Sequence, residues 1–508
     1  MEKSKFQPME ASENMSTRNN NGDLLIEKEL KKLSDKINAS VEVVSIILAA
    51  GHGKRLKSEK PKMLHEIWGK PTVYRVSEAA TEGLGSNNQI IVVGKKALQV
   101  ARALGKKEGR VFVYQKDQRG TGDAVRVALD SHYLNGFNGQ VYIFPGDMGL
   151  LTKEMVKDFK NKFEKFGCDM MVMTGIYEDD PQSNYYGRIL KDPETSEIIE
   201  IKEFKDIIAL PDDQNYIVES KGKRYSFSKN ELLRIGEFNA GVYGFRIEPL
   251  KRLIAHIKPD NVQGEIYITD LIKIFNDNGL KVCTSAVEKN DYILGFNVKS
   301  VLKKMETTFR DMVYEKLKDI VLIDDPEDFF IAEETVNRII ELDKKYSALD
   351  IRIGKGAYIG KGVFVNRGLE IGKNTSVTGN VIIGENVKIG ESVVISTYPE
   401  QKMTIGDNVQ ILNGNVLQGN IEIGPNVRIE TGVRITGSDE YPVRIGSGVL
   451  IKGTTYIFGS IIEEDLLIEH SILKNKYVEK VVKKNGKIQP IRYILPHPEG
   501  LDSIRDIE

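Results

Sequence analysis

Residues 353–395 read IGKGAYIGKGVFVNRGLEIGKNTSVTGNVIIGENVKIGESVVI, and every sixth residue from Ile353 onward is isoleucine or valine. After a step of ten residues the spacing resumes at Ile405, and after a second step of ten it resumes at Ile445. The apolar positions are Ile353, Ile359, Val365, Ile371, Val377, Ile383, Ile389, Ile395, Ile405, Ile411, Leu417, Ile423, Ile429, Ile435, Ile445, Ile451 and Ile457. This period of six indicates a repeat protein in which each short strand turns one apolar side chain inward.

The residue after the apolar one is often glycine, which fits the corners of a β-helix. Three hexads make one triangular coil, and at its corners the backbone must turn without a Cβ in the way. Corner glycines stand at Gly354, Gly360, Gly372, Gly384, Gly390, Gly406, Gly424 and Gly446. A β-sandwich is the alternative, but its strands alternate with a period of two and vary in length. We therefore predict a β-helix of about six stacked coils that serves assembly or a second site.

Composition excludes several classes of protein. The chain has 508 residues, enough for two or three domains, and its net charge of −1 gives no broad field for nucleic acid or an acidic membrane. No apolar stretch has the length of a membrane span. Cys168 and Cys283 stand at neither metal nor redox spacing, so we expect unpaired thiols in a reducing cytoplasm.

Upstream of the repeat, patterns of buried strands alternate with helical patterns. We expect strands at 41–50, 89–93, 111–114, 141–144 and 170–176 and helices at 73–82 and 122–129. This alternation favours a mostly parallel α/β sheet with its ligand at the carboxyl ends of the strands. The predicted domains are an N-terminal extension (1–40), the α/β domain (41–300), a helical linker (301–348), the β-helix (349–475) and a tail (476–508).

The N-terminal extension offers little chemistry. Residues 1–23 are rich in Asn, Ser and Glu and lack the apolar segment of a signal peptide, so we expect disorder there. Residues 24–36 have the pattern of a short amphipathic helix. The extension is therefore predicted to be partly disordered, and its role cannot be read from the pattern.

The first expected strand runs into a glycine-rich turn, Leu48-Ala49-Ala50-Gly51-His52-Gly53-Lys54-Arg55, followed by Lys60-Pro61-Lys62-Met63-Leu64-His65. Such a turn presents backbone N–H groups, and its small residues let a base or phosphate approach closely. Leu56 stands where the dinucleotide fingerprint needs a third glycine, and the Gly-Lys-Ser/Thr of the P-loop is absent. By itself the stretch fits either a nucleotide loop or a tight turn with surface cations.

Residues 44–65 resemble the signature of sugar-nucleotide pyrophosphorylases, and most of all the family of bifunctional UDP-N-acetylglucosamine pyrophosphorylase/glucosamine-1-phosphate acetyltransferases. Further motifs follow in the family's order over about residues 44–345. They are Gln115 with Gly120-Thr121-Gly122-Asp123-Ala124, Pro145-Gly146-Asp147, Tyr186-Gly187-Arg188-Ile189, Glu203 with Lys205-Asp206, Asn239-Ala240-Gly241-Val242-Tyr243, Gln263-Gly264-Glu265-Ile266-Tyr267-Ile268-Thr269-Asp270 and Gly295-Phe296-Asn297. The resemblance implies a Rossmann-like nucleotidyltransferase domain joined by a helical arm to a left-handed parallel β-helix.

The resemblance also implies a reaction and its residues. A sugar-1-phosphate oxygen would attack the α-phosphorus of UTP, with Mg²⁺ held by Asp147 and Asn297, Lys62 on the reacting phosphates and Arg55 on the departing pyrophosphate. Each residue also has a plainer explanation, since Asp147 fits a turn and Asn297 a helix cap. For the nucleotide, Leu48, Ala49, Ala50, Gly51, Gly53, Gln115, Gly120 and Thr121 are implied. For the sugar, Gly187, Glu203, Asn239, Glu265 and Tyr267 are implied.

Two departures from the family pattern bear on function. Thirty-six residues separate Glu203 from Asn239, and the extra piece, residues 210–236, has the pattern of a β-hairpin beside the sugar pocket. The family's acetyltransferase half uses a histidine base, but no histidine occurs between Ile353 and Glu469, and His470 lacks the family's neighbouring residues. We therefore expect the acetyltransferase to be missing and the β-helix to serve as a scaffold, with a homotrimer implied by the superfamily.

Together these features predict a cytoplasmic, Mg²⁺-dependent uridylyltransferase that makes UDP-N-acetylglucosamine, a cell-wall precursor, from UTP and N-acetylglucosamine-1-phosphate. No nucleic-acid or membrane partner is expected. Three alternatives stay open. The same chemistry could act on another sugar-1-phosphate, such as glucose-1-phosphate, or on another nucleoside triphosphate. The chain could be bifunctional after all. It could also be a non-catalytic assembly or regulatory subunit.

Overall fold

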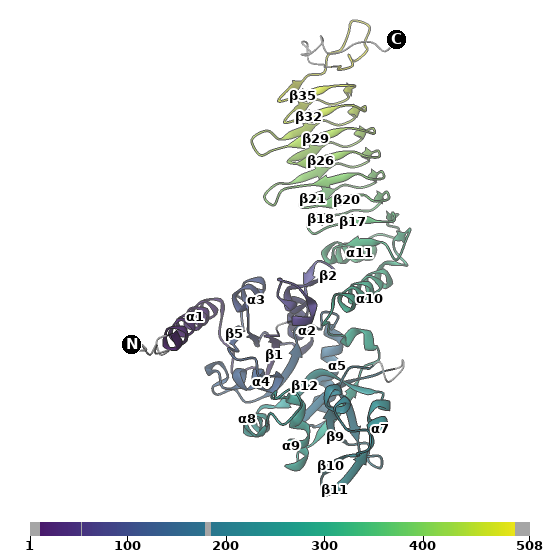
Figure 1. The fold of residues 1–508 in the computed structure, drawn as a ribbon. Helices are drawn as coiled ribbons and strands as arrows, with labels where there is room; N and C mark the ends of the chain where they lie inside the picture. Colours follow the sequence, from purple (N-terminus) through teal and green to yellow (C-terminus); the bar gives the residue numbers. More distant parts are fainter. Residues whose placement is uncertain (1–10, 52, 178–183, 493–508) are drawn as a thin grey trace, which may run out of the picture. The chain divides into compact units, whose positions relative to one another are not determined.

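The computed structural model describes residues 11–51, 53–177 and 184–492, and the chain divides into two compact units, residues 1–308 and 309–508. The first unit is built on a nine-stranded sheet in the order β13-β7-β12-β6-β1-β4-β5, with β8 joining β12 to β9 (Figure 1). Its strands are β1 (Val43–Ala49), β4 (Gln89–Val93), β5 (Arg110–Tyr114), β6 (Gln140–Pro145), β7 (Met170–Ile176), β8 (Arg188–Lys191), β9 (Ile198–Lys202), β12 (Glu237–Arg246) and β13 (Val282–Ala286).

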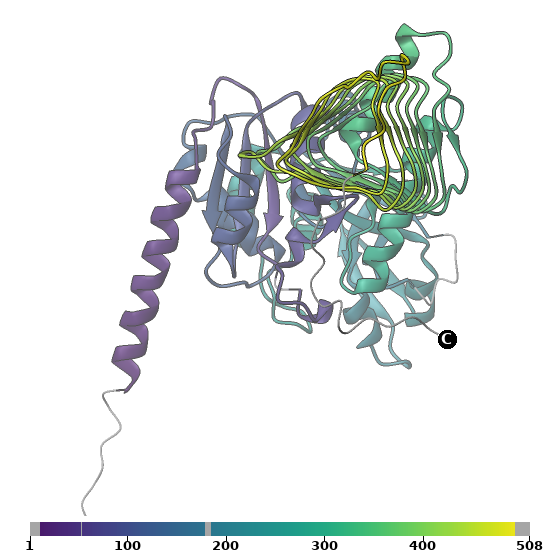
Figure 2. The same ribbon diagram turned by 90° about the horizontal axis from the view of Figure 1, so that it is seen from above.

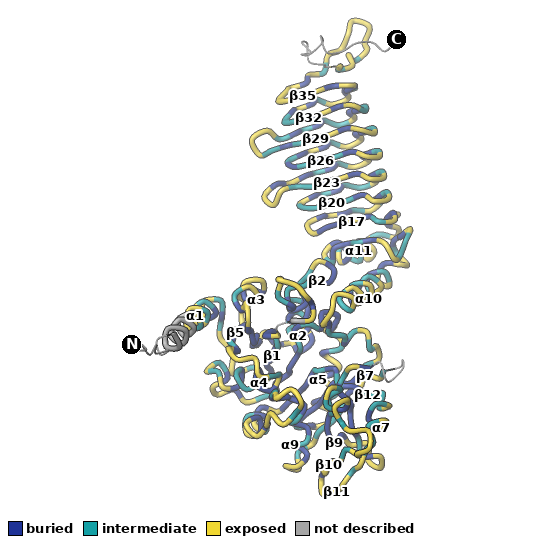
Figure 3. The backbone as a smooth tube through the Cα atoms, in the orientation of Figure 1, coloured by how far each residue is buried: buried dark blue, intermediate teal, exposed yellow. Residues whose placement is uncertain are grey.

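Helices cover both faces of this sheet, and the burial colours of Figure 3 show buried residues on the strands and on the helices that pack against them. One face packs on α2 (Thr72–Leu84), α3 (Ala97–Leu104) and α5 (Lys153–Phe166), and the other on α4 (Thr121–Leu129), α8 (Ile247–Leu253) and α9 (Leu271–Asp277). In β1, Val44 and Ile46 join one core and Ile47 and Ala49 the other. Because alternate side chains of a strand point to opposite faces, this continuous apolar run is what a strand buried on both sides needs.

The predicted strands are all present, and β1 pairs in parallel with β4 and β6 as expected. The pattern did not reveal β12, which runs antiparallel between β6 and β7 and is irregular between Asn239 and Tyr243. Two glycines, Gly241 and Gly244, interrupt its alternation of apolar residues. A strand broken by a bulge and glycines lacks the regular period on which a sequence-based prediction depends.

The N-terminal extension carries a longer helix than predicted. Helix α1 spans Ala11–Leu33, so the expected disorder is wrong for residues 11–23, while residues 1–10 lie outside the described part. Leu30 of this helix is buried in the core on the face of the sheet that α2, α3 and α5 cover. The Oγ of Ser34 accepts a hydrogen bond from the Phe112 N–H at 2.9 Å on β5. Since β5 is an edge strand, the end of this helix covers backbone groups that would otherwise be open to another chain.

The two cysteines correct a second prediction. Cys168, just before β7, and Cys283, on β13, form a disulfide although 115 residues separate them. The spacing could not show this, because the pairing comes from β13 lying next to β7 in the sheet. The argument for a reducing compartment from unpaired thiols therefore fails, and a cytoplasmic location stays a prediction. In the described ranges, no helix is both long and apolar enough to cross a membrane.

The second unit is a left-handed parallel β-helix with a triangular cross-section, seen along its axis in Figure 2. Three parallel sheets, named here A, B and C, form its sides. Sheet A contains β14 (Leu322–Ile323), β16 (Arg352–Ile353), β19 (Glu370–Ile371), β22 (Lys388–Ile389), β25 (Gln410–Ile411), β28 (Arg428–Ile429), β31 (Leu450–Ile451) and β34 (Leu467–Ile468). Sheet B contains β15 (Phe329–Ile331), β17 (Ala357–Ile359), β20 (Ser376–Thr378), β23 (Val394–Ser396), β26 (Val416–Gly419), β29 (Arg434–Gly437), β32 (Tyr456–Phe458) and β35 (Ile472–Lys474). Sheet C contains β18 (Val363–Phe364), β21 (Val381–Ile383), β24 (Met403–Ile405), β27 (Ile421–Ile423), β30 (Val443–Ile445), β33 (Ile461–Ile462) and β36 (Tyr477–Val478).

The predicted interior positions are buried throughout, and the fold class is confirmed. The stack begins earlier than the predicted boundary at residue 349, because β14 pairs with β16 and β15 with β17. Helix α10 (Lys299–Leu317) precedes these strands, and α11 (Glu333–Lys345) lies between them and the first hexad. The Lys- and Glu-rich composition of residues 300–345 predicted the helices but hid the two short strands.

The corner glycines have a different reason from the one expected. Gly384 does not have a left-handed backbone, but a Cβ there would lie 2.8 Å from the carbonyl carbon of Gly406 in the next coil. The left-handed residues come two positions later, at Asn386 (φ 55°) and Asn408 (φ 59°). Glycine is therefore required by the close approach of successive coils, while asparagine, which tolerates this conformation, makes the turn.

Shorter elements position the site in the first unit. They are η1 (Lys54–Leu56), η2 (Lys62–Leu64), β2 (Glu66–Ile67), β3 (Lys70–Pro71), η3 (His132–Leu134), α6 (Phe204–Ile208), β10 (Tyr216–Ser220), β11 (Lys223–Phe227), α7 (Lys229–Arg234), η5 (Ile254–His256), η6 (Ile268–Asp270) and η7 (Asn290–Ile293). Strands β10 and β11 pair antiparallel, so the hairpin predicted for residues 210–236 is confirmed.

Candidate nucleotide and metal site

Three residues far apart in the sequence meet at the carboxyl end of the sheet. The Nζ of Lys62, on η2, lies 2.5 Å from Asp147 Oδ2 and donates a hydrogen bond to Asn297 Oδ1 at 2.9 Å. Asp147 follows β6, and Asn297 stands before α10. The side chains of Lys62 and Asp147 are only 9% and 13% exposed, so their charges interact more strongly than a surface pair would. The predicted phosphate-binding lysine and both predicted metal ligands therefore share one place.

Glycines make room for this cluster. Gly53 has φ 60°, and a Cβ there would lie 2.9 Å from the Cβ of Lys62. A Cβ on Gly295 would lie 3.1 Å from Asp147 Oδ2. The N–H of Gly146 donates to the carbonyl oxygen of Leu48 at 3.0 Å, which ties the Asp147 turn to the end of β1. The glycine-rich turn after β1 therefore supports the side-chain cluster as well as offering backbone to a ligand.

Two aromatic rings border the cluster. The ring centroid of Phe296 lies 5.4 Å from Lys62 Nζ, within the range of a cation–π contact. His65 packs edge-on against Phe296, with ring centroids 6.2 Å apart. Burial lowers the pKa of His65, and the charge of Lys60 acts in the same direction. A neutral His65 adds no further positive charge beside Lys62.

The predicted ligand set fits a divalent cation that also binds phosphate. No group of three or more His, Cys, Asp or Glu side chains that could hold a metal occurs in the described residues. Asp147 and Asn297 present one carboxylate and one amide oxygen to a common point, the position of Lys62 Nζ. Mg²⁺ prefers oxygen ligands and usually keeps only one or two from protein, taking the rest from phosphates and water. The small number of protein ligands is therefore suited to a metal that binds with a nucleotide.

The base-reading residues lie together between β5 and α4. Gln115, after β5, is 3% exposed, and its Nε2 donates to Asp123 Oδ2 at 2.9 Å. Gly120 has φ 119°, a conformation that glycine adopts without strain. Thr121 begins α4, and its Oγ1 accepts a hydrogen bond from the Ile268 N–H at 3.2 Å. Asp123 thus fixes the amide nitrogen of Gln115, the residue predicted to contact the base.

The glycine-rich loop also meets this region. Leu48 and Ala49 end β1, and Ala50 follows it. The carbonyl oxygen of Ala50 accepts a hydrogen bond from Gln118 Nε2 at 2.5 Å. Gly51 is exposed and open to a ligand, Arg55 is exposed on η1, and His52 lies outside the described residues. The sequence does not single out Gln118, since a single glutamine in a polar loop carries no pattern.

The sugar-pocket residues converge around β8, β12 and α6. The Asn239 N–H donates to the Gly187 carbonyl at 2.9 Å, and Asn239 Nδ2 donates to the Tyr243 hydroxyl at 2.8 Å. A Cβ on Gly187 would lie 3.2 Å from Glu203 Oε1. Arg188, which belongs to the predicted motif but was not assigned to the sugar, is fully buried and donates to the Asn184 carbonyl at 2.7 Å. Gly187, Glu203 and Asn239, which are predicted to bind the sugar, thus lie close together.

A second segment closes this region. The hydroxyl of Tyr267 accepts a hydrogen bond from Gln263 Nε2, and Gln263 Oε1 accepts one from Lys205 Nζ. The Ile266 N–H donates to the Arg119 carbonyl at 2.7 Å, so this segment touches the base-reading loop as well. Glu265 is half-buried, and its own N–H donates to Asn261 Oδ1 at 3.2 Å. The motif predicted as a pocket wall therefore links the sugar side to the base side.

Carboxylates accumulate beside the sugar pocket. Burial raises the pKa of Glu203 to about 7, with the neighbouring charges of Asp206 and Asp270 acting in the same direction. Burial likewise raises the pKa of Asp270 to about 6, assisted by Glu200 and Asp206. Near neutral pH Glu203 therefore exists partly protonated, and it can donate or accept a hydrogen bond with a sugar substituent.

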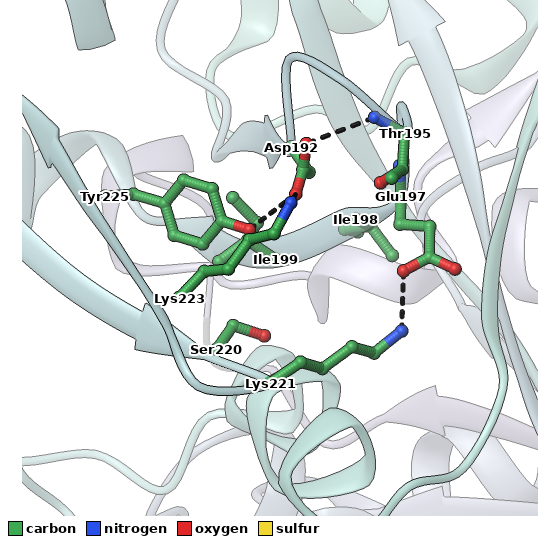
Figure 4. A pocket seen from close by; sticks show the side chains of 9 residues that line it. All are labelled: Asp192, Thr195, Glu197, Ile198, Ile199, Ser220, Lys221, Lys223 and Tyr225. Carbon is green, nitrogen blue, oxygen red and sulfur yellow. Dashed lines mark hydrogen bonds and ion pairs between the residues drawn. The ribbon is translucent and has the colours of Figure 1, made fainter.

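The inserted hairpin packs behind this pocket. Its Tyr216 hydroxyl donates to Glu200 Oε1 at 2.6 Å. A cavity of about 100 Å³ lies between the hairpin and the β8–β9 turn (Figure 4). Asp192 lines it and already accepts hydrogen bonds from the Tyr225 hydroxyl at 2.6 Å and from the Glu194 N–H at 2.7 Å. None of the predicted site residues lines this cavity. The carboxylate of Asp192 anchors the hairpin through its hydrogen bond with Tyr225.

In the described part of the second unit, the one histidine lies near the end of the stack. His470 has φ 43° and is exposed at a corner of the last coils, with its Nδ1 2.5 Å from Thr454 Oγ1. The sequence holds no other histidine after residue 353 except His497, which lies outside the described residues. The absence of acetyltransferase activity, which we predict from the lack of a histidine base in the coils, stays a prediction.

Comparison with known families supports both units. Residues 45–188 match the family described as MobA-like NTP transferase domain. Residues 402–437 match six repeats of the family described as bacterial transferase hexapeptide. These matches identify a nucleotidyltransferase domain and a hexapeptide-repeat domain in the order that the sequence motifs predict.

Curated relatives point the same way. The chain is 35% identical over 294 residues to the bifunctional protein GlmU of Caldanaerobacter subterraneus subsp. tengcongensis, covering 58% of this chain and 57% of the relative. It is 34% identical over 293 residues to the bifunctional protein GlmU of Thermoanaerobacter pseudethanolicus, with the same coverage. The match thus spans little more than half the length of these relatives. The resemblance to this bifunctional family is confirmed over that part.

A crystal structure of UDP-glucose pyrophosphorylase complexed with UDP-glucose is also similar, with a TM-score of 0.37 and 17% identity. The similar region covers 54% of this chain and 100% of that structure's chain.

Proposed function

We propose that the first unit is a Mg²⁺-dependent uridylyltransferase that converts UTP and N-acetylglucosamine-1-phosphate into UDP-N-acetylglucosamine and pyrophosphate. The observation that carries this proposal is the meeting of Lys62, Asp147 and Asn297 at one point. A buried lysine with one carboxylate and one amide oxygen is suited to binding a metal and a triphosphate together. The nucleotidyltransferase domain match at residues 45–188 supports the same reaction class.

The chemistry requires alignment and charge compensation. An oxygen of the sugar-1-phosphate attacks the α-phosphorus of UTP, a new P–O bond forms, and the bond to the β-phosphate oxygen breaks as pyrophosphate leaves. Both reactants are anions, so positive charge must draw them together and stabilise the transition state. Lys62 would neutralise the reacting phosphates and Arg55 the departing pyrophosphate. Mg²⁺ held by Asp147 and Asn297 would stabilise charge on the phosphate oxygens.

Substrate choice rests on the two neighbouring regions. Gln115, Gly120 and Thr121 would read uracil, and Leu48, Ala49, Ala50, Gly51 and Gly53 would line the nucleotide. Gly187, Glu203, Asn239, Glu265 and Tyr267 would surround the sugar. N-acetylglucosamine is proposed because this chain's motifs resemble those of that family, and two similar curated proteins bear the name bifunctional protein GlmU. Glucose-1-phosphate and other nucleoside triphosphates are the alternative substrates.

The test is pyrophosphate release across a grid of nucleoside triphosphates and sugar-1-phosphates, with and without Mg²⁺. Release confined to UTP and N-acetylglucosamine-1-phosphate supports the proposal. Release with another pair keeps the mechanism and changes the substrates, which directs attention to the hairpin at Tyr216 behind the pocket. No release with any pair would favour a non-catalytic assembly or regulatory subunit.

Acetyl transfer to glucosamine-1-phosphate is a second candidate function, because residues 402–437 match the hexapeptide repeats of bacterial transferases. Against it, no histidine lies between Ile353 and Glu469 to serve as the general base. We therefore propose that the second unit has no acetyltransferase activity. Release of coenzyme A from acetyl-CoA in the presence of glucosamine-1-phosphate would contradict this.

We also propose that the second unit assembles the chain into a homotrimer through sheet B. Sheet A has charged outward side chains that pair between coils, such as Lys388 Nζ with Glu370 Oε1 at 2.6 Å. The outward column of sheet B is mostly uncharged. In strand order it contains Phe330, Tyr358, Ser376, Val394, Val416, Arg434, Tyr456 and Ile472. Tyr358, Val394, Tyr456 and Ile472 of this column are exposed, and exposed apolar side chains gathered on one face are typical of a protein interface.

A further inference from the structure

The position of the Lys62 ammonium has a consequence for metal binding. Its Nζ lies 2.5 Å from Asp147 Oδ2 and 2.9 Å from Asn297 Oδ1, the two oxygens that the proposed function assigns to Mg²⁺. Mg²⁺ binds oxygen at about 2.0–2.1 Å. A metal bound to these same two oxygens would lie close to the nitrogen of Lys62. The ammonium and the metal would therefore compete for them.

The surroundings stabilise the ammonium between these two oxygens. Lys62 is 9% exposed, and the face of Phe296 lies 5.4 Å from its Nζ. A Cβ on Gly53 would lie 2.9 Å from the Cβ of Lys62, so the turn after β1 packs tightly on the stem of this side chain. A charge enclosed in this way is stabilised by its partners rather than by water. The Lys62–Asp147 pair is thus a built contact and not a loose surface pair.

We propose that Lys62 is an internal counter-ion that blocks the divalent-metal position until a nucleoside triphosphate arrives. This rests on the proposed function, since it takes Asp147 and Asn297 as the metal ligands. The triphosphate brings enough negative charge to hold both cations. Asp147 and Asn297 would then hold the metal, and the Lys62 ammonium would contact the phosphates instead. Metal binding and the delivery of Lys62 to its substrate are one event, so metal and nucleotide bind cooperatively.

The direct test is metal binding without nucleotide, measured with Mn²⁺ by electron paramagnetic resonance or calorimetry. Mn²⁺ accepts the same oxygen-rich octahedral sites as Mg²⁺. Removing a unit charge within a few ångströms of the metal in Lys62→Met should tighten Mn²⁺ binding at least about tenfold. Lys62→Gln is a second neutral variant in case one of them folds poorly, and thermal unfolding verifies that each is folded.

Two controls separate this effect from a general change of charge. Lys62→Arg keeps the positive charge and should keep the weak Mn²⁺ binding of the wild type. Lys60→Met removes a nearby charge that pairs with Glu66 at 2.8 Å and lies on the surface, and it should change Mn²⁺ affinity less than twofold. In the wild type, a non-hydrolysable UTP analogue should raise Mn²⁺ affinity, and this coupling should shrink in Lys62→Met.

The possible failures are distinguishable. If folded Lys62→Met and Lys62→Gln bind Mn²⁺ no tighter than the wild type, and Asp147→Ala abolishes that binding, the counter-ion proposal is overturned and the metal assignment survives. If Mn²⁺ binding in Lys62→Met persists after Asp147→Ala is added, the metal lies elsewhere and the metal assignment of the proposed function fails as well. Tighter binding that depends on Asp147 supports both.

Discussion

The two units of this chain differ in how far apart in the sequence their contacting residues lie, and in whether those contacts repeat. In the β-helix, each interior residue meets the equivalent residue of the next coil, as Ile389 meets Ile411 on sheet A. In the transferase unit, Lys62 meets Asn297 across 235 residues of sequence. Repetition makes the first kind of contact visible as a period, whereas the second kind exists only once the sheet has formed. We propose catalysis for the first unit, where contacting residues are far apart in the sequence, and a scaffold role for the second unit, where equivalent contacts repeat.

The largest effect should come from breaking the distant cluster. Asp147→Ala removes the proposed metal carboxylate and leaves Lys62 without its buried partner. We expect pyrophosphate release to fall by about 10³-fold or more, because metal stabilisation of phosphate charge is lost. The matched control is Asp192→Ala, which removes an equally well-bonded carboxylate at the hairpin. Retention of more than a tenth of the activity in Asp147→Ala would contradict the metal assignment.

The repeat should respond differently to a core substitution. Ile411→Ala leaves a cavity inside one coil and should lower the free energy of unfolding of the second unit by about 2–5 kcal/mol. Ile389→Ala and Ile429→Ala, the equivalent positions one coil away on each side, should cost similar amounts because their surroundings are alike. Denaturant unfolding followed by circular dichroism measures this. Pyrophosphate release by the folded variants should stay within twofold of the wild type. A large loss would show that the activity of the first unit depends on the second unit.

The outward faces of the β-helix supply a smaller test. Tyr456 is 36% exposed in the apolar column of sheet B. Tyr456→Glu places an unpaired charge in the proposed interface and should weaken assembly by about tenfold or more. Sedimentation at several protein concentrations would show the smaller species. Gln410→Glu on sheet A is the control, and an equal effect of both variants would argue against sheet B as the interface.

The smallest effect concerns protonation at the sugar pocket. The pKa of Glu203 is raised to about 7 in the folded protein, above its ordinary value of 4.5, so the folded state binds the proton more tightly than the unfolded state. Its contribution to stability is therefore fully present below pH 4.5 and is lost as pH rises through about 7. Glu203→Gln should flatten this part of the profile of melting temperature against pH. An unchanged slope would place the proton elsewhere.

How much could be predicted from sequence follows the same division. The period of six predicted the β-helix interior, and ordered motifs predicted Lys62, Asp147 and Asn297 as site residues. The disulfide between Cys168 and Cys283 could not be predicted, because it depends on β13 lying beside β7. The corner glycines were predicted for the wrong reason, since contact between coils is invisible within one hexad. Gln118 could not be predicted, because it acts through a backbone carbonyl that any sequence provides.

The most direct test of the central claim follows the phosphorus of UTP by ³¹P nuclear magnetic resonance, with the full chain, N-acetylglucosamine-1-phosphate and Mg²⁺. The account predicts that the triphosphate signals are replaced by those of a sugar-nucleotide diphosphate and of free pyrophosphate, and that chelating Mg²⁺ stops the change. Triphosphate signals that persist in the presence of folded protein and all three components would contradict it.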